Sequence, residues 1–261
     1  MQDAQSIIDT AHEMADAAGR AILPFFRRAG LTADNKRPAD FDPVTEADRA
    51  AERAMREVLA RRRPQDGIFG EEYGTQKGSS GLTWILDPID GTRAFICGAP
   101  SWGVLIGLSD GEQIRYGIID QPYIGERFEG GLGLSRLVSA KGEHQLCVRT
   151  GVDLSRATLM TTFPEVGTAE EGAAFRRIAE QVRLTRYGLD CYAYALLALG
   201  QIDLVIEAGL QSYDIAGPMA VVQAAGGIVT NWQGETAING GQVIAAATPE
   251  LHRAALELLR G

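Results

Sequence analysis

Cysteine and histidine are scarce in this sequence of 261 residues, which has three of each. Cys97, Cys147 and Cys191 form no CxxC pair, and an odd number of scattered cysteines argues against a disulfide framework. We expect them to be small buried residues of a protein in the reducing cytoplasm. The histidines lie far apart without ligand spacing, so neither a zinc site nor a Ser–His–Asp triad is indicated.

Positive charge and long apolar runs are also lacking. The 25 lysines and arginines face 34 aspartates and glutamates, which gives a formal net charge of −9. This balance repels nucleic acid, so we expect no DNA or RNA partner. It also repels an anionic substrate unless cations lie in the binding site. No apolar run approaches the roughly 20 residues that a membrane span needs, and the acidic amphipathic start does not resemble a signal peptide. We therefore expect no membrane partner and a cytoplasmic location.

Hydrophobic periodicity divides the chain into two halves. Residues 1–150 begin with amphipathic helices at 3–29 and from about Thr45, where Asp48 completes a variant capping box, and continue with strands and a hairpin around 109–112. In residues 151–261, strands alternate with helices. This predicts an α+β half with a helix pair and an antiparallel sheet, followed by an α/β half. The expected strands are 68–69, 83–86, 104–108, 114–119, 126–128, 136–140, 158–162, 202–208, 227–232 and 243–247, and the later helices are 170–181, 190–199, 215–225 and 249–259.

The most informative segment is an apolar strand that runs into two acids, Trp84-Ile85-Leu86-Asp87-Pro88-Ile89-Asp90-Gly91-Thr92. Pro88 stiffens the turn, so the two carboxylates can converge on one or two cations. Oxygen ligands suit Mg²⁺, which keeps open positions for water and for a substrate phosphate. The N–H groups of Gly91 and Thr92 could cradle phosphate oxygens. The alternative is an exposed acidic turn with a capping role.

Two other segments supply further acids. Phe69-Gly70-Glu71-Glu72 places a pair of acids directly after a short strand, and Asp214 opens a helix. A carboxylate at a helix N-terminus is favourable in its own right, so capping is the alternative role of Asp214. Like charges about 4 Å apart repel by about 4 kcal/mol at an effective dielectric of 20. Four converging carboxylates would therefore need cations to stay ionised together.

These motifs, taken in order, resemble those of the inositol monophosphatase superfamily. The matching segments are Val44-Thr45-x-x-Asp48, Gly70-Glu71-Glu72, Trp84-x-x-Asp87-Pro88-Ile89-Asp90-Gly91-Thr92-x-x-Phe95, Tyr213-Asp214-Ile215-Ala216 and Ala225-Gly226-Gly227. The resemblance covers nearly the whole chain. It implies a layered αβαβα sandwich of the sugar-phosphatase (inositol monophosphatase-like) type, usually a homodimer, with two or three Mg²⁺ per site.

The resemblance also implies roles for single residues. The implied metal ligands are the side chains of Glu71, Asp87, Asp90 and Asp214 and the backbone carbonyl of Ile89. Glu71 and Thr92 would position and activate the attacking water, with Asp48 as an acid near the Thr92 hydroxyl. A metal-activated water would then attack phosphorus in line, without a phosphoenzyme. The haloacid dehalogenase phosphatases, which use an aspartyl nucleophile, have their two acids two positions apart; here they are three apart.

Three further segments resemble the histidinol-phosphate phosphatase branch, at 93–103, 119–128 and 186–194. Inositol monophosphatases typically carry a small residue where Asp190 falls. Acids at Asp190 and Glu207 would complement the ammonium group and imidazole of histidinol phosphate. Leu189 departs from the branch, where glycine is expected, and this puts the pocket shape in doubt. The implied substrate-binding residues are Gly91, Thr92, Arg186, Asp190, Glu207 and Asp214.

The sequence therefore predicts a Mg²⁺-dependent phosphomonoesterase that converts L-histidinol phosphate to L-histidinol and phosphate in histidine biosynthesis. An inositol-1-phosphate or broad sugar-phosphate phosphatase is the alternative substrate class. A non-catalytic subunit that binds phosphoesters is an alternative of another kind. Three substrate residues also have structural interpretations: Asp190 as a helix N-cap, Arg186 as a solvated or salt-bridged surface residue, and Glu207 as a hydrogen-bonded structural acid.

Overall fold

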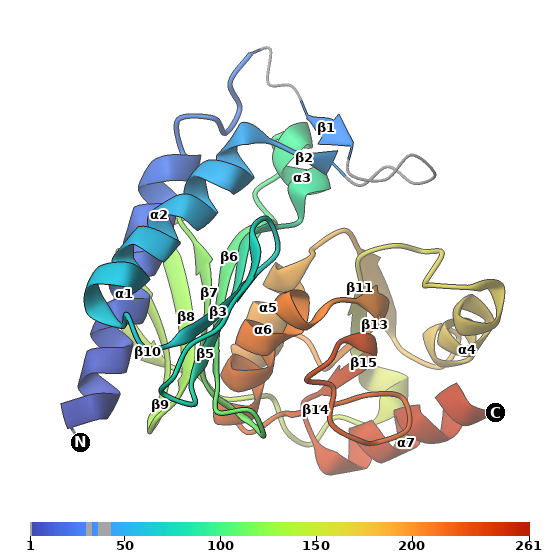
Figure 1. Cartoon of the computed structure of the whole chain (residues 1–261). Coiled ribbons are helices and arrows are strands. Elements are labelled where there is room, and N and C mark those ends of the chain that lie inside the picture. The colour runs from blue at the N-terminus through green and yellow to red at the C-terminus, as the bar shows by residue number, and fades with distance from the viewer. Residues whose placement is uncertain (1, 30–32, 36–42) are drawn as a thin grey trace.

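Helices and sheets alternate in layers through the chain (Figure 1). A computed structural model describes residues 2–29, 33–35 and 43–261. Helices α1 (Gln2–Ile22) and α2 (Glu46–Arg62) cover one face of a large sheet, and α5 (Cys191–Ala198) and α6 (Ser212–Ala224) cover the other. A smaller sheet follows, and α4 (Ala169–Ala179) and α7 (Pro249–Arg260) pack together on its outer side. The predicted αβαβα sandwich is confirmed.

The large sheet has eight strands and carries most of the first half of the chain. They are β3 (Gly67–Gly70), β4 (Gly74–Gln76), β5 (Thr83–Asp90), β6 (Gly103–Ser109), β7 (Ile114–Gln121), β8 (Glu126–Gly131), β9 (Leu134–Ser139) and β10 (Gly142–Gln145), in the spatial order β10-β9-β8-β7-β6-β5-β3-β4. Only the β3–β5 pair is parallel among these neighbours, and the others are antiparallel. The expected hairpin joins β6 to β7.

The small sheet is mixed. Its strands are β11 (Thr158–Thr161), β12 (Leu184–Tyr187), β13 (Leu204–Leu210), β14 (Ile228–Thr230) and β15 (Gly241–Ala246), in the spatial order β12-β11-β13-β15-β14. β11 runs parallel to both β12 and β13, and β15 runs antiparallel to β13 and β14. The parallel pairing brings the carboxyl ends of β11 and β13 to one edge, where polar side chains from both can meet.

The predicted helices form, with two boundaries wrong: α6 begins at Ser212, three residues before the expected start at 215. α1 ends at Ile22 instead of residue 29, because Pro24 has no backbone N–H and disfavours a helical conformation at the residue before it. At α2 the capping box is confirmed, since Thr45 is the N-cap and Asp48 bonds back to its N–H. A short helix, α3 (Thr92–Cys97), was not expected after the acidic turn.

Small connecting elements complete the description. β1 (Asp34–Asn35) and β2 (Pro43–Val44) pair with each other, and a 3-10 turn spans Leu154–Arg156. The loop expected at 30–43 lies largely outside the described residues. None of the helices in the described ranges is sufficiently long and apolar to cross a membrane.

The prediction of three buried cysteines is wrong for two of them. Cys191 is buried, but Cys97 and Cys147 are exposed. Cys97 is the last residue of α3, directly before the left-handed Gly98 that ends this helix. Cys147 lies between the buried Leu146 and Val148, so its side chain faces the other way.

The helix that carries Asp214 packs very closely on the large sheet. A Cβ on Gly217 of α6 would lie 2.7 Å from the carbonyl oxygen of Ile118, which is closer than two such atoms approach. Ala216 of α6 lies equally near Gly107 of β6: a Cβ added to Gly107 would be 2.6 Å from the Cβ of Ala216. The small residues of α6 therefore let its first turn reach the end of β5.

Candidate metal centre

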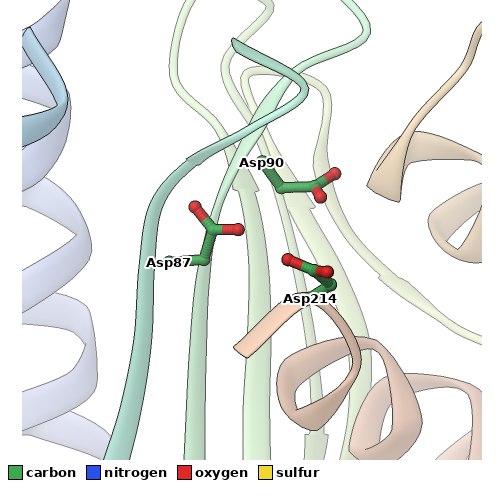
Figure 2. Close-up of side chains that lie close together, drawn as sticks. All are labelled: Asp87, Asp90 and Asp214. Atoms are coloured by element: carbon green, nitrogen blue, oxygen red, sulfur yellow. The ribbon is translucent and has the colours of Figure 1, made fainter. Parts of the chain in front are cut away.

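Three acids from two elements converge at the end of β5. Ligand oxygens of Asp87, Asp90 and Asp214 all lie within 4.8 Å of one another. Figure 2 shows Asp87 and Asp90 on the β5 segment and Asp214 at the start of α6, with their carboxylates pointing into a shared space. Residues three apart on a regular strand face opposite sides, but the pairing of β5 with β6 shifts register between Asp87 and Asp90. This irregularity brings both acids to one side.

Asp214 caps α6 and also belongs to the acidic cluster. Its Oδ2 accepts a hydrogen bond of 2.6 Å from the backbone N–H of Gln211, the N-cap of α6. This contact fixes the side chain at the helix start, which faces the cluster. Capping and membership of the acidic cluster are therefore compatible, because capping is what orients the carboxylate.

Glu71 joins the cluster from β3. Its N–H donates to the Leu86 carbonyl over 3.1 Å, which places it beside β5. Its carboxyl group is a hydrogen-bond partner of Asp87, and its negative charge raises the pKa of Asp87. The turn that follows is held by the buried Glu52 of α2, which accepts from the N–H of Glu72 over 2.7 Å and of Tyr73 over 3.2 Å. Glu71 therefore reaches the cluster as predicted, while its neighbour Glu72 is tied to α2 through its backbone.

Thr92, Ile89 and Asp48 form a hydrogen-bonded group beside the acids. The Thr92 hydroxyl lies 3.0 Å from the Ile89 carbonyl oxygen and 3.3 Å from Asp48 Oδ1. Asp48 is fully buried, and its Oδ2 accepts from the N–H and hydroxyl of Thr45. The capping box of α2 thus orients an acid toward the Thr92 hydroxyl, which agrees with the expected placement of Asp48.

The acids of this cluster raise one another's pKa values. Burial raises the pKa of Asp87 well above its usual range, and repulsion from Glu71, Asp90 and Asp214 raises it further. Burial, then repulsion from Asp214 and Asp190, likewise raises the pKa of Asp90, against a lowering by hydrogen bonds from Cys191. The ionised forms of these carboxyl groups are therefore disfavoured unless positive charge is added. Their converging oxygens fit a hard divalent cation such as Mg²⁺. We call Glu71, Asp87, Asp90 and Asp214 the metal end.

The metal end opens into a cavity of about 260 Å³ that also holds two other acids. Asp190 and Glu207 line it together with the four acids of the metal end, and with Gly91, Thr92 and Ile89. We call Asp190 and Glu207 the distal end. Among the described residues that line the cavity, Arg93 alone has a cationic side chain. The structure therefore gathers ten of the predicted site residues around the cavity, nine lining it and Asp48 bonded to Thr92.

Asp190 occupies the N-cap position of α5 without capping it. Its side chain makes no cap hydrogen bond, and Ser101 instead donates to its Oδ2 over 3.1 Å. Its backbone has φ 48° and ψ −141°, a conformation that costs a residue with a side chain roughly 1–3 kcal/mol. Burial raises the pKa of Asp190, opposed by Ser101 and by the charge of Arg93. Its carboxylate is therefore available to the cavity.

Glu207 is anchored by the neighbouring strand. Thr162 donates to its Oε1 from both the backbone N–H, over 2.8 Å, and the hydroxyl, over 2.9 Å, and Thr161 donates to its Oε2 over 3.1 Å. Burial raises the pKa of Glu207 to about 7 in spite of these bonds. The structural interpretation of Glu207 thus holds alongside its place in the cavity wall.

Arg186 and Leu189 lie away from the cavity wall. Arg186 is on β12 with an exposed side chain. Leu189 is half-buried and packs against the apolar core between the sheets. Substrate binding by Arg186 stays a prediction, and Leu189 does not narrow this cavity.

Several contributors to the site were missed in the sequence. They are Ser101, Thr161, Thr162 and Tyr194, together with Arg93 and Phe163 at the cavity wall. The threonines could have been found, since the ends of parallel strands share an edge. Tyr194 could not: it is one residue in an apolar helix, yet it is buried, lines the cavity, and its hydroxyl has no hydrogen-bond partner among the described residues.

Comparisons with known proteins cover the whole chain. The model of the inositol monophosphatase family matches residues 3–261. The chain is 40% identical to the protein named bifunctional phosphatase IMPL2, chloroplastic, of Arabidopsis thaliana, covering 94% of this chain and 72% of that protein. It is 31% identical to the histidinol-phosphatase of Chlorobaculum parvum, covering 94% and 93%. The solved structure of an inositol monophosphatase from Zymomonas mobilis superposes with a TM-score of 0.86 at 42% identity, covering 98% of each chain.

Proposed function

The chain belongs to the inositol monophosphatase family of phosphatases, and on this premise we propose that it hydrolyses L-histidinol phosphate to L-histidinol and phosphate with Mg²⁺. The observation that carries the proposal is the pair of acids at the distal end, Asp190 and Glu207, in the same cavity as the metal end. A cavity acidic at both ends suits a substrate with a phosphate at one end and a cationic group at the other.

The metal end would receive the phosphate. Glu71, Asp87, Asp90 and Asp214, with the carbonyl of Ile89, would hold Mg²⁺, which when bound supplies positive charge for the phosphoryl oxygens and makes water more acidic. Gly91 and Thr92 lie at the N-terminus of α3, where backbone N–H groups can donate to phosphate oxygens. The chain itself thus contributes anchoring and orientation of the phosphoryl group.

A proton acceptor lies beside the phosphate position. The Thr92 hydroxyl donates to Asp48 Oδ1 over 3.3 Å. Thr92 Oγ1 could therefore accept a proton from the attacking water while its own hydroxyl proton passes to Asp48. Glu71 is the other acid placed to accept a proton, since it lines the cavity beside Asp87. These groups would keep the attacking water oriented while it loses its proton.

The distal end would receive the amino alcohol. An ammonium group gains most from a carboxylate that is largely out of water and already oriented, and Asp190 meets both conditions. Glu207 is held by Thr161 and Thr162 and would face the same part of the substrate. An inositol ring has no positive charge to offer to either acid.

Inositol-1-phosphate is the second candidate substrate. The similarity to the Zymomonas mobilis inositol monophosphatase, at 42% identity, favours it. The two substrates differ in charge at the distal end, so they are separated by one comparison of rates. A non-catalytic phosphoester-binding subunit would bind either ester and release no phosphate.

The test is phosphate release from both esters, side by side, with and without Mg²⁺. We expect kcat/KM for histidinol phosphate to exceed that for inositol-1-phosphate at least tenfold and activity to require Mg²⁺. Asp190→Asn should raise KM for histidinol phosphate about tenfold or more and leave inositol-1-phosphate nearly unchanged, because only the first has an ammonium group to lose. Asp153→Asn, which changes an exposed cap of a 3-10 turn, is the matched control. Comparable kcat/KM values for the two esters would reject histidinol phosphate as the substrate.

We also propose a homodimer in the cytoplasm with two or three Mg²⁺ per site. Calorimetric titration gives the metal count, and sedimentation gives the oligomeric state. A monomer by sedimentation would contradict the homodimer, and a single Mg²⁺ by titration would contradict the metal count.

A further inference from the structure

Asp190 has a backbone conformation that is costly for a residue with a side chain. Its φ of 48° and ψ of −141° fall in a region where such strain persists only if neighbouring contacts impose it. An aspartate at an N-cap normally turns its carboxylate to the N–H groups of the next turn. Here that bond is not made. Asp190 is therefore strained at its backbone and does not use its carboxylate to cap α5.

Three contacts fix the start of α5 against the first half of the chain. The Cys191 N–H donates to Asp90 Oδ2 over 2.6 Å, which ties α5 to the metal end. The Asp190 carboxyl group lies against Gly91, where a Cβ would be 2.9 Å from Asp190 Cγ. The third contact is the hydrogen bond from Ser101, 89 positions away in sequence and just before β6. Of these three contacts, this one alone bonds the Asp190 carboxylate itself.

We propose that Ser101 is a positioning residue that holds the Asp190 carboxylate toward the cationic group of the substrate. The inference rests on the proposed function, since it requires a substrate cation for Asp190 to bind. A carboxylate held through Oδ2 keeps its other oxygen for that cation. The serine thereby reduces the rotational freedom that Asp190 would lose on binding.

Arg93 supports the same arrangement from the cavity wall. Its guanidinium carbon lies 4.9 Å from the centroid of the Phe163 ring, a cation–π contact that keeps this charge at the cavity. That charge lowers the pKa of Asp190, against the effect of burial, and so favours its ionised form. Ser101 orients the carboxylate, and Arg93 helps keep it charged.

The experiment compares five variants on two esters, histidinol phosphate and inositol-1-phosphate, with Mg²⁺. Ser101→Ala should raise KM for histidinol phosphate roughly tenfold, with kcat within twofold, because a hydrogen bond to a charged group is lost. Ser101→Thr, which keeps the hydroxyl, should restore most of the affinity. Inositol-1-phosphate should respond to neither change. Ser109→Ala, at the other end of β6, is the matched control and should leave the ratio of the two KM values unaltered.

A double-mutant cycle separates positioning from general damage. In the Asp190→Asn background, Ser101→Ala should have no further effect on KM for histidinol phosphate, since the two residues act as one unit. Equal effects of Ser101→Ala on both esters, or additive effects in the double variant, would overturn the role of Ser101 alone. If Asp190→Asn itself fails to distinguish the esters, the proposed substrate is wrong and the role of Ser101 falls with it.

Discussion

The two ends of the cavity hold their acids in different ways. At the metal end, the buried Asp87 and the half-buried Asp90 lie among other carboxylates that raise their pKa values. At the distal end, Asp190 accepts from one hydroxyl and Glu207 from two hydroxyls and one N–H. A cluster that disfavours its own ionisation calls for cations from outside. Asp90 and Asp214 also accept from backbone N–H groups, so the ends differ in the mutual repulsion of the metal-end acids and in the hydroxyl donors of the distal-end acids, which can recognise a single charged group.

The largest test of this contrast is Asp90→Asn. We expect kcat/KM to fall on the order of 10³-fold for every phosphate ester, because an amide would replace a proposed ligand oxygen beside the proposed position of the phosphoryl group. Calorimetric titration should show weakened Mg²⁺ binding. Asp190→Asn is the matched control at the distal end and should leave Mg²⁺ affinity unchanged. Retention of more than a tenth of the activity by Asp90→Asn would mean that the two ends do not differ as described.

Stability against pH without metal provides the second test. A carboxyl group whose pKa is higher in the folded than in the unfolded state takes up a proton on folding, so its contribution is present at low pH and is lost as pH rises through the folded value. Asp87 and Asp90 shift upward from 3.8, and Glu207 shifts from 4.5 to about 7. For Glu207 alone this amounts to about 3 kcal/mol lost between pH 4.5 and about 7.

Urea unfolding in EDTA should therefore give a lower free energy of unfolding at pH 8 than at pH 5. Mg²⁺ should remove the part of this difference that comes from Asp87 and Asp90, because it binds the folded state with the acids of the metal end ionised, while the part that comes from Glu207 should remain. Glu129, whose pKa is lowered to about 2, stays ionised between pH 5 and pH 8, so its contribution to the free energy of unfolding does not change over this range. A free energy of unfolding that rises from pH 5 to pH 8 in EDTA would contradict the upward shifts.

Gly91 lies where the two ends touch, and Gly91→Ala tests that contact. Gly91 has φ 84°, and an added Cβ would be 2.9 Å from Asp190 Cγ. Gly125, with φ 79° and no atom within 4 Å of its added Cβ, is the matched control. Each alanine should cost about 1–2 kcal/mol for the left-handed backbone. Gly91→Ala should cost a further 1–2 kcal/mol or so for the clash and should lower kcat/KM. Equal unfolding temperatures for the two variants would show that the contact with Asp190 is not tight.

The metal end could be predicted from sequence because its acids are marked by local patterns. Asp87 and Asp90 end an apolar strand, Glu71 follows another, and Asp214 lies in the first turn of a helix. Each position is defined by the segment that contains it. Their convergence depends on topology, which local patterns do not contain and which the resemblance to a family implies.

No local pattern marks the donors of the distal end, although the shared edge of the parallel strands β11 and β13 could have indicated the two threonines. Thr162 meets Glu207 across 45 positions and Ser101 meets Asp190 across 89, through strand pairing and helix docking that leave no local pattern. Strands β4, β10 and β12 were not predicted, and the cause is related. β10 is exposed throughout, and β4 and β12 have only one partly buried residue each, so none of them shows the alternation of buried and exposed residues that marks a strand. α1 ends early because Pro24 interrupts the helix although the apolar periodicity continues to Phe25.

Tyr194 lies between the two ends and gives the smallest expected effect. It is buried beside Glu207, Asp90 and Asp214, and burial, with the repulsion of these acids, keeps its phenol protonated by raising the pKa. Removal of a buried hydroxyl that has no partner costs little, so Tyr194→Phe should leave the unfolding temperature in EDTA unchanged or slightly raised. Tyr116→Phe is the opposite case, since its hydroxyl bonds the buried Glu129, and should cost about 1–3 kcal/mol. A loss of stability in Tyr194→Phe as large as in Tyr116→Phe would show that its hydroxyl already bonds a carboxylate, and the two ends would then share a donor instead of being held separately.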